Sequence, residues 1–326
     1  MIPGVDGNPR LAVSEAVQAE ELGLASVWIA EKYDAKDLPS LAGALAMATS
    51  TIAMGAAVTH TGLRHPLTIA SMGQTLQALS RGRFRLGFGR GAPRKWVDAG
   101  VSAPTLRSLE DTADILRRLW AGETVSYHGP AGRFPSMRIR VLPDVPPPPL
   151  YLAAIGPKTL SLAGRCFDGV ILHPFLTPDA VAQSVAIMRE ARDSAGRSQE
   201  TFNVFAAVVA PSEIELAAQI RSASSRASRY CMTSTVRTPL LAANGWNPNL
   251  VQYERRPTDP GGTTKRPQLP LKWLRSASAL GNEVEQVHRL KEYLAAGANE
   301  IILHGATAHQ LGKVVHRFNG GEQTCQ

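Results

Sequence analysis

Two histidines stand directly after apolar runs and are the first candidates for chemistry. His173 follows residues 170–172, and His304 follows residues 301–303. An imidazole can accept or donate a proton near neutral pH, which suits it to act as an acid or a base. In a barrel of parallel strands both side chains would point at the mouth. A hydrogen-bonded structural histidine is the simpler interpretation of either one alone.

The charged pair Glu31-Lys32 follows another apolar run, residues 26–30. These side chains would either contact a ring cofactor or substrate, or form a salt bridge in an exposed loop, and the sequence favours neither. The chain shows no His-x-x-x-His pair, no Ser-His-Asp set, no paired carboxylates and no metal-ligand pattern. The lack of an evident acid-base set indicates a cofactor that carries the chemistry.

The glycine turn Gly89-Arg90-Gly91 follows a strand-like run. It matches the G-x-G-x-x-A form of the dinucleotide fingerprint only weakly, because Pro93 and Gly100 argue against a helix starting at once. Several strand-helix units precede it, whereas the fingerprint opens the first such unit. We instead expect these glycines to let the backbone approach a flat cofactor.

A second turn, Gly156-Pro157-Lys158-Thr159, opens a helical stretch. Proline suits the first helical position, and the amides of Lys158 and Thr159 would then form an anion site at the helix N-terminus. The Lys158 ammonium and the Thr159 hydroxyl add a charge and a donor. The alternative is an ordinary Gly-Pro helix start, and we favour phosphate binding.

Two further histidines lie just before a helical stretch that starts at Pro66. His60 is as consistent with an acid-base role as with a structural one. For His65 we favour a role in capping or orienting the helix.

Alternating strands and helices must position these residues. Continuous apolar runs between amphipathic stretches indicate a parallel sheet that is covered by helices. Strands are predicted at residues 26–30, 52–59, 84–88, 150–154, 169–173, 203–209 and 300–303. Helices are predicted at residues 9–22, 39–48, 66–79, 105–120, 157–166, 178–195, 282–296 and 309–318.

These elements predict an α/β fold, an eight-stranded (β/α)8 TIM barrel. Residues 1–4 resemble the tail of a first strand, so we expect that strand to be truncated. A doubly wound open sheet is the alternative.

Two segments interrupt the alternation and are predicted to be insertions in one barrel domain that spans residues 1–326. Residues 122–149 hold short strand-like pieces and a proline run, which indicates an insertion on the barrel rim. Residues 212–281 are rich in Ser, Thr, Arg and Pro, and a structureless loop of this length is uncommon in a compact domain. We favour a solvated, partly helical insertion. A lid over an anionic ligand and a stretch read in a shifted frame are the alternatives.

The charge of the chain is concentrated in one place. Its 35 basic and 27 acidic residues give a net charge of +8, and residues 221–275 hold ten bases and only two acids. The remainder is therefore neutral. A nucleic-acid binder would usually spread its basic residues over a face or a helix, so no nucleic-acid partner is expected.

Composition also bears on the compartment. No run approaches the roughly 20 apolar residues of a membrane helix, and the N-terminus lacks a secretory pattern. Cys166, Cys231 and Cys325 are odd in number and far apart, which indicates neither a disulfide framework nor a zinc site. We therefore expect a cytoplasmic protein without a membrane partner.

Several motifs in a fixed order resemble the bacterial luciferase-like monooxygenase family. The motifs lie at residues 20–31, 63–66, 79–91 and 163–169, and the resemblance extends over residues 1–209 and 281–318. The branch that the chain resembles is the actinobacterial oxidoreductases that use the deazaflavin coenzyme F420.

The resemblance implies a (β/α)8 barrel, usually a homodimer, that binds F420 or FMN at the mouth of the barrel. It implies a cis peptide bond matching Ala57-Val58, which would bulge the strand ending at Thr59 under the cofactor ring. It also implies phosphate-binding turns that correspond to Gly89-Arg90-Gly91 and to Gly156-Pro157-Lys158-Thr159.

Two departures from the family pattern limit what the resemblance implies. Many relatives carry an Asp-His pair where this chain has Glu31-Lys32, and Ala92 replaces the catalytic Glu of the sugar-phosphate dehydrogenases. The sugar-phosphate reaction is therefore not carried over.

We expect an F420-dependent oxidoreductase that transfers a hydride to or from an unknown small organic substrate. Lys32, His173 and His304 would hydrogen-bond or protonate that substrate. An FMN-dependent monooxygenase and a degenerate barrel without activity are the alternatives.

Overall fold

A seven-stranded parallel sheet forms the centre of the molecule. The computed structural model describes residues 8–32, 35–91, 93–212, 215–255 and 265–320. Each strand pairs in parallel with its neighbour in the sheet. The order of the strands is β1 (Ser26–Ile29), β2 (Ala53–Ala56), β3 (Phe84–Phe88), β6 (Leu150–Ala154), β7 (Gly169–Leu172), β8 (Asn203–Val209) and β11 (Glu300–His304).

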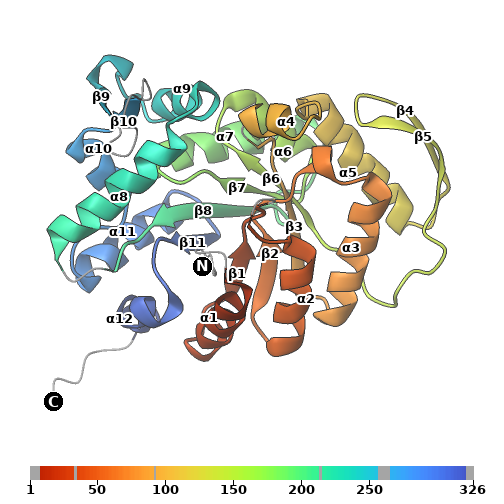
Figure 1. Cartoon of the computed structure of the whole chain (residues 1–326), viewed down its shortest axis with the longest axis horizontal. Coiled ribbons are helices and arrows are strands. Elements are labelled where there is room, and N and C mark those ends of the chain that lie inside the picture. The colour runs from red at the N-terminus through yellow and green to blue at the C-terminus, as the bar shows by residue number, and fades with distance from the viewer. Residues whose placement is uncertain (1–7, 33–34, 92, 213–214, 256–264, 321–326) are drawn as a thin grey trace.

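Helices cover the outer face of this sheet, which curls into a nearly closed barrel (Figure 1). Local signals account for where the helices begin. Asn8 caps the first helix, and His65 Nδ1 accepts a hydrogen bond from the Leu67 amide at the start of the third, as predicted. The covering helices are α1 (Pro9–Glu21), α2 (Leu38–Ala48), α3 (Pro66–Leu79), α5 (Leu106–Trp120), α6 (Pro157–Cys166), α7 (Pro178–Ser194), α11 (Glu283–Ala295) and α12 (Ala308–Phe318).

The barrel interior forms its own small core, separate from the core between sheet and helices. Trp28, Tyr151 and Phe205 meet edge to face there, with ring centroids 4.8–6.2 Å apart. Gly55 makes room for this layer, because a Cβ on it would lie 2.4 Å from the Trp28 ring. The guanidinium carbon of Arg85 lies 5.2 Å from the centroid of the Phe205 ring. The aromatic layer therefore supports whatever lies above it at the mouth.

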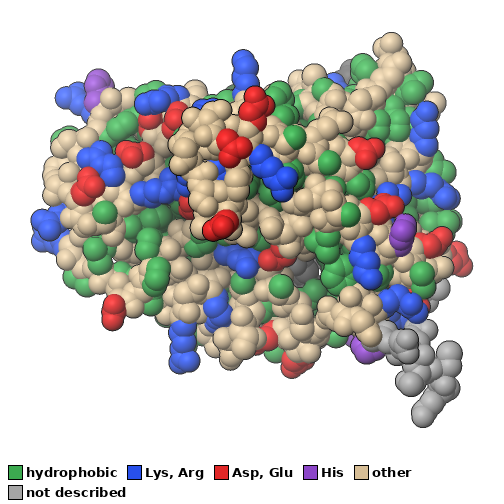
Figure 2. Space-filling model, turned by 180° about the vertical axis from the view of Figure 1, so that it is seen from behind, with side chains coloured by type: hydrophobic (Ala, Val, Ile, Leu, Met, Phe, Trp, Pro, Cys, Tyr) green, Lys and Arg blue, Asp and Glu red, His purple; other side chains and the backbone are tan. Residues whose placement is uncertain are grey.

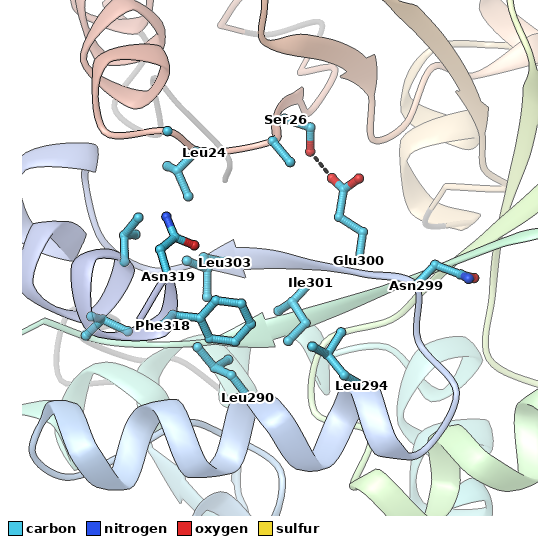
Figure 3. Close-up of a pocket in the computed structure, with 14 residues that line it drawn as sticks. Leu24, Ser26, Leu290, Leu294, Asn299, Glu300, Ile301, Leu303, Phe318 and Asn319 are labelled. Carbon is cyan, nitrogen blue, oxygen red and sulfur yellow. Dashed lines mark hydrogen bonds between the residues drawn. The ribbon is translucent and has the colours of Figure 1, made fainter. Parts of the chain in front are cut away.

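A seam separates the two edge strands of the described sheet, β1 and β11 (Figure 3). The Ser26 hydroxyl donates a hydrogen bond to the Glu300 carboxylate across this seam, and Arg85 contacts the same carboxylate at 2.8 Å. Beside this contact a cavity of about 250 Å³ lies between the strands and helices α11 and α12. The predicted remnant of a first strand, residues 1–4, lies outside the described residues.

The two interruptions of the barrel contain regular structure. The first holds the antiparallel hairpin β4 (Val125–Gly129) and β5 (Gly132–Met137). In the second, Trp246 and Trp273 stack with centroids 4.8 Å apart and both are buried. The described elements of the second segment are α8 (Leu216–Tyr230), α9 (Ser234–Ala243), η2 (Pro248–Leu250), β9 (Gln252–Arg255), β10 (Lys265–Gln268) and α10 (Leu271–Ser276).

Two sequence predictions near the mouth were wrong. The second strand of the sheet ends at Ala56 rather than at Thr59, and Thr59 then forms an isolated bridge with Phe88. Contrary to prediction, a helix, α4 (Pro93–Asp98), does begin directly after the glycine turn. Gly100 marks the end of this helix with a φ of 67°, so it is a stop signal and not evidence against a helix.

Charged side chains of both signs are interspersed on the face that Figure 2 shows. Among the described residues, no helix combines the length and the apolar character needed to cross a membrane.

Candidate functional site

A cavity of about 560 Å³ opens at the carboxyl ends of the strands, the position at which barrel enzymes build their sites. This volume lies within the usual range for small-molecule sites, about 300–1,000 Å³. Nine of the candidate residues named from the sequence line it. They are Ala57, Val58, His60, Gly89, Arg90, Gly91, Gly156, Thr159 and His173.

Small and branched apolar side chains form the floor of this cavity. The peptide bond Ala57-Val58 is cis, at the position that the family resemblance implies. Next to it lie Ile171, Ala207 and Ile302, which belong to the same cluster as the aromatic layer inside the barrel. The cavity therefore has an apolar lining at the strand ends, which suits a planar ring.

One wall is the turn Gly89-Arg90-Gly91 together with the helix that follows it. Gly91 has a φ of 66°, a conformation that favours glycine, and an added Cβ would lie 2.8 Å from His60. The Trp96 indole donates a 2.7 Å hydrogen bond to the Arg90 carbonyl, and its ring meets His60 edge to face at 5.5 Å. The turn is thus held between two rings.

The cavity wall also contains the N-terminus of α6. Gly156 is its N-cap residue and offers no side-chain cap, while Pro157 occupies the first helical position. Gly156 and Thr159 line the cavity; Pro157 and Lys158 are not among the lining residues. The positive end of the helix dipole therefore lies at the cavity, which suits a phosphate group. Of the two predicted amide donors, that of Thr159 already donates to the Gly156 carbonyl at 3.0 Å.

Glu31 and Thr59, both predicted to bind cofactor, lie buried below the cavity wall. The Glu31 carboxylate accepts hydrogen bonds from the Thr59 hydroxyl at 2.8 Å, from the His60 amide at 3.1 Å and from Arg64. Burial opposes its ionisation, but the hydrogen bonds from His60, Arg64 and Thr59 outweigh this and lower the pKa of Glu31. Neither side chain is among those lining the cavity, and together they tie β1 to the chain that follows β2.

His173 and His304 come together around a residue that the sequence did not single out. The Tyr230 hydroxyl lies 3.0 Å from Nε2 of His304, and its ring meets the His173 ring edge to face at 4.8 Å. His173 Nδ1 lies 2.8 Å from the Pro174 carbonyl. Of these three, Tyr230 and His173 line the cavity and His304 stands behind them.

Burial keeps both imidazoles neutral at physiological pH. It lowers the pKa of His173 to about 4, partly opposed by the hydrogen bond with Pro174. Burial, followed by the nearby charges of Arg226 and Arg229, lowers the pKa of His304 to about 3. Neither histidine carries a charge at pH 7, so both act there as neutral hydrogen-bonding groups.

Lys32, predicted to act on the substrate, does not line the cavity. It forms an isolated backbone bridge with Lys36. Trp96 and Tyr230 line the cavity without having been predicted, since each comes from a helix that no motif marks. Ala92 and Cys325 lie outside the described residues.

Comparisons with known proteins agree with this geometry. Residues 3–300 match the model of the luciferase-like monooxygenase family. The chain is 33% identical to a 5,10-methylenetetrahydromethanopterin reductase of Methanolobus tindarius, over 57% of this chain and 58% of that protein. It is 25% identical to an F420-dependent glucose-6-phosphate dehydrogenase of Amycolatopsis mediterranei strain U-32, over 91% and 89% of the two chains.

The chain covers less than two thirds of the length of the first curated relatives that it matches. Among solved structures, it resembles an F420-dependent secondary alcohol dehydrogenase in complex with an F420-acetone adduct, with a TM-score of 0.75 and 18% identity. That match covers 95% of this chain and 93% of the other, and it confirms the barrel fold. The family model spans nearly the whole barrel, and the chain therefore belongs to the luciferase-like monooxygenase family.

Proposed function

We propose that this chain is an F420-dependent oxidoreductase that transfers a hydride between the deazaflavin and a small organic substrate. The observation that carries the proposal is the cavity at the strand ends, which combines an apolar lining with a helix N-terminus. The named relatives, a methanopterin reductase and an F420-dependent dehydrogenase, support it.

The residues present fit such a cofactor. A planar tricyclic ring needs an apolar surface, and Ala57, Val58 and Ile302 provide one. A phosphate needs donors without a competing carboxylate. No Asp or Glu lines the cavity within the described part of the chain, and Thr159 and the α6 N-terminus lie in its wall.

The bound deazaflavin would supply a carbon that accepts or donates the hydride. The chain's own residues would hold the phosphate at Gly156 and Thr159 and shape the second wall with Gly89, Arg90 and Gly91. Pro157 fixes the start of the helix that holds the phosphate, and the exposed Lys158 would add positive charge outside the cavity.

We propose supporting roles for the remaining predicted residues near the mouth. Glu31 and Thr59 would hold the backbone beneath the cofactor in place. His173, with His304 behind it, would hydrogen-bond the substrate. Lys32 would act on the substrate only from outside the cavity wall and would contribute charge there.

Fluorescence titration of the purified protein with F420 and with FMN tests this function. We expect F420 to bind with a micromolar or lower Kd and FMN to bind more weakly. If neither cofactor binds at micromolar concentrations, the proposal fails and the degenerate-barrel alternative stands.

The alternative enzyme is an FMN-dependent monooxygenase that receives its electrons from a separate reductase. The chain's membership of the luciferase-like monooxygenase family is the observation behind this alternative. Tight FMN binding, together with an F420 affinity that does not depend on the length of the polyglutamate tail, would select this alternative.

We further propose a homodimer that works in the cytoplasm. The family resemblance supports the dimer, and light scattering coupled to size-exclusion chromatography tests it. The two described cysteines, Cys166 and Cys231, are free thiols, which fits a reducing compartment. Fractionation of the source cells tests the location.

A further inference from the structure

We propose that Tyr230 binds the oxygen atom of an uncharged alcohol or carbonyl substrate, held in position by His304. This inference rests on the proposed hydride-transfer function and names a substrate class and a substrate-binding residue for it. It begins from a feature that this function does not use, which is a tyrosine that helix α8 delivers to the barrel mouth.

Helix α8 is fixed to the barrel by contacts one turn apart. Arg226 donates a 3.2 Å hydrogen bond to the Gly305 carbonyl, directly after β11. Tyr230, four residues later on the same face, reaches His304 at the end of β11. The C-terminus of the helix is held as well, because Arg237 donates to the Cys231 carbonyl at 2.9 Å. The phenol of Tyr230 is thus placed by three independent contacts.

The phenol has hydrogen-bonding capacity that its protein partner does not exhaust. A tyrosine hydroxyl has one donor and lone pairs, and His304 Nε2 accounts for only one of these interactions. Tyr230 lines the cavity, and its ring meets that of His173, another lining residue, at 4.8 Å. A substrate oxygen that accepts or donates a hydrogen bond here would share the cavity with a cofactor ring bound over Ala57 and Val58.

The groups around this position select against charge. Burial raises the pKa of Tyr230, and both neighbouring imidazoles are neutral, so none of the three carries a charge at pH 7. Val236 and Pro239 complete this side of the wall. Arg90 is the one Lys, Arg, Asp or Glu among the lining residues that the structure describes, and it lies in the glycine turn. The positive charges of Arg226 and Arg229, which act on Tyr230 and His304, come from side chains that are not among the lining residues. A charged substrate beside the phenol would therefore lose its hydration without a counter-charge in direct contact.

The reaction balances with an alcohol as substrate. Its C–H and O–H bonds break and a C=O bond forms. The hydride, with both electrons, passes to the oxidised deazaflavin, and the hydroxyl proton leaves to the solvent. Tyr230 would accept the O–H hydrogen bond at the start and donate to the carbonyl oxygen at the end. His304, whose pKa is about 3, positions the phenol and does not retain the proton.

The test compares Tyr230→Phe with Tyr253→Phe in the full chain. Both substitutions remove one phenol hydroxyl, but Tyr253 lies on β9 and is 48% exposed. F420 is titrated by fluorescence, and its reduction by 2-propanol, 2-butanol, cyclohexanol and glucose 6-phosphate is followed at 420 nm. Cyclohexanone is titrated separately into the F420 complex as an uncharged carbonyl ligand.

We expect at least one alcohol to reduce F420 and glucose 6-phosphate not to do so. Tyr230→Phe should lower kcat/KM about tenfold, which corresponds to about 1.4 kcal/mol and one hydrogen bond. It should weaken cyclohexanone binding and leave the F420 Kd within about twofold of wild type. Tyr253→Phe should change none of these values.

Three results would overturn the inference while F420 still binds. They are turnover of glucose 6-phosphate, no binding or turnover of any uncharged compound, and a Tyr230→Phe effect confined to the F420 Kd. Failure of the wild-type chain to bind F420 would instead refute the proposed function itself. His304→Asn tests the positioning role, because its effect on kcat/KM should vanish in the Tyr230→Phe background.

Discussion

Gly89 lies so close to Val58 that no side chain fits between them. A Cβ built on Gly89 would stand 2.3 Å from Cγ2 of Val58. Two residues earlier, a Cβ built on Gly87 would stand 2.2 Å from the Ala56 carbonyl oxygen. The end of β3 is therefore pressed against the segment of chain that forms the cavity floor, and glycine at both positions is a requirement of that contact.

The substitution Gly89→Ala should damage cofactor binding and stability together. The new methyl group must push Val58 out of the floor, so we expect the F420 Kd to rise at least about tenfold and the free energy of unfolding to fall by about 1–3 kcal/mol. Fluorescence titration and urea unfolding measure the two effects. Gly43→Ala is the control, because Gly43 lies in helix α2 with open space around its Cα. An equal response of both variants would contradict the proposed contact.

Glu20 should make the protein sensitive to acid. Its carboxylate accepts hydrogen bonds from the Ser50, Thr51 and Ile52 amides before β2. Burial opposes these bonds, but together they lower the pKa of Glu20 to about 2. A carboxyl group with a depressed pKa in the folded state stabilises the fold above its unfolded pKa. That stabilisation is lost as the pH falls from about 4.5 toward 2.

The variant Glu20→Gln isolates this effect. We expect it to lower the free energy of unfolding at pH 7 by about 0.5–1 kcal/mol, a figure reduced for solvent screening. The difference from wild type should shrink as the pH approaches 2. Urea unfolding across this pH series, with Glu21→Gln as the neighbouring exposed control, provides the measurement. A difference that stays constant with pH would show that the carboxylate charge is not involved.

His173 should destabilise the fold at mildly acidic pH. Its folded pKa of about 4 lies below its ordinary value of 6.5, so between these values the unfolded chain binds a proton that the folded chain does not. The stability that the neutral His173 contributes is therefore fully present above pH 6.5 and is lost as the pH falls toward 4, by about 3 kcal/mol. His173→Asn, which can still donate to the Pro174 carbonyl, should make this slope shallower, and the remainder would belong to His304, whose pKa is lowered as well. An unchanged slope would assign the acid sensitivity to other groups.

Thr159 offers a test of the phosphate position. Thr159→Val keeps the shape of the side chain and removes its hydroxyl, so we expect the F420 Kd to rise about three- to tenfold. Thr235→Val, elsewhere in the same cavity wall, is the matched control and should leave the Kd unchanged. Equal effects would place the phosphate away from α6. The affinity of wild type for F420 should also fall with added salt, since the phosphate and tail are anionic.

Sequence patterns predicted the elements whose formation depends on local physics. A buried parallel strand needs a continuous apolar run, and Gly169–Leu172 and Asn203–Val209 were found in this way. Helix α4 was missed because Pro93 and Gly100 were interpreted as helix breakers. In the structure they mark the first residue of this helix and the turn that ends it.

The same distinction holds at the cavity. Gly156, Gly89 and His173 follow directly from strand ends, so their placement could be predicted from the sequence. Tyr230 lies in a Ser- and Arg-rich helix of a segment that was predicted to be a solvated insertion, with a lid as an alternative. No motif in this segment marked Tyr230. Its contact with His304 joins residues 74 apart in the chain, and no local pattern encodes such a pairing.

Within the described residues, the seam between β1 and β11 gives the barrel wall two ends, so its backbone amides should exchange with deuterium unevenly. Strand residues bond alternately to either side, and the Ala57 amide bonds to the Ile29 carbonyl on the β2 side. The Trp28 amide therefore faces the seam. In β11 the His304 carbonyl accepts from the Ala210 amide on the β8 side, so by the same alternation the Leu303 amide faces the seam. We expect labelling to enter first along these two strands and last in β3 and β6, measured peptide by peptide by mass spectrometry. This result would show that the sheet unfolds locally at the β1–β11 edge, while the hydrogen bonds between the central strands remain intact.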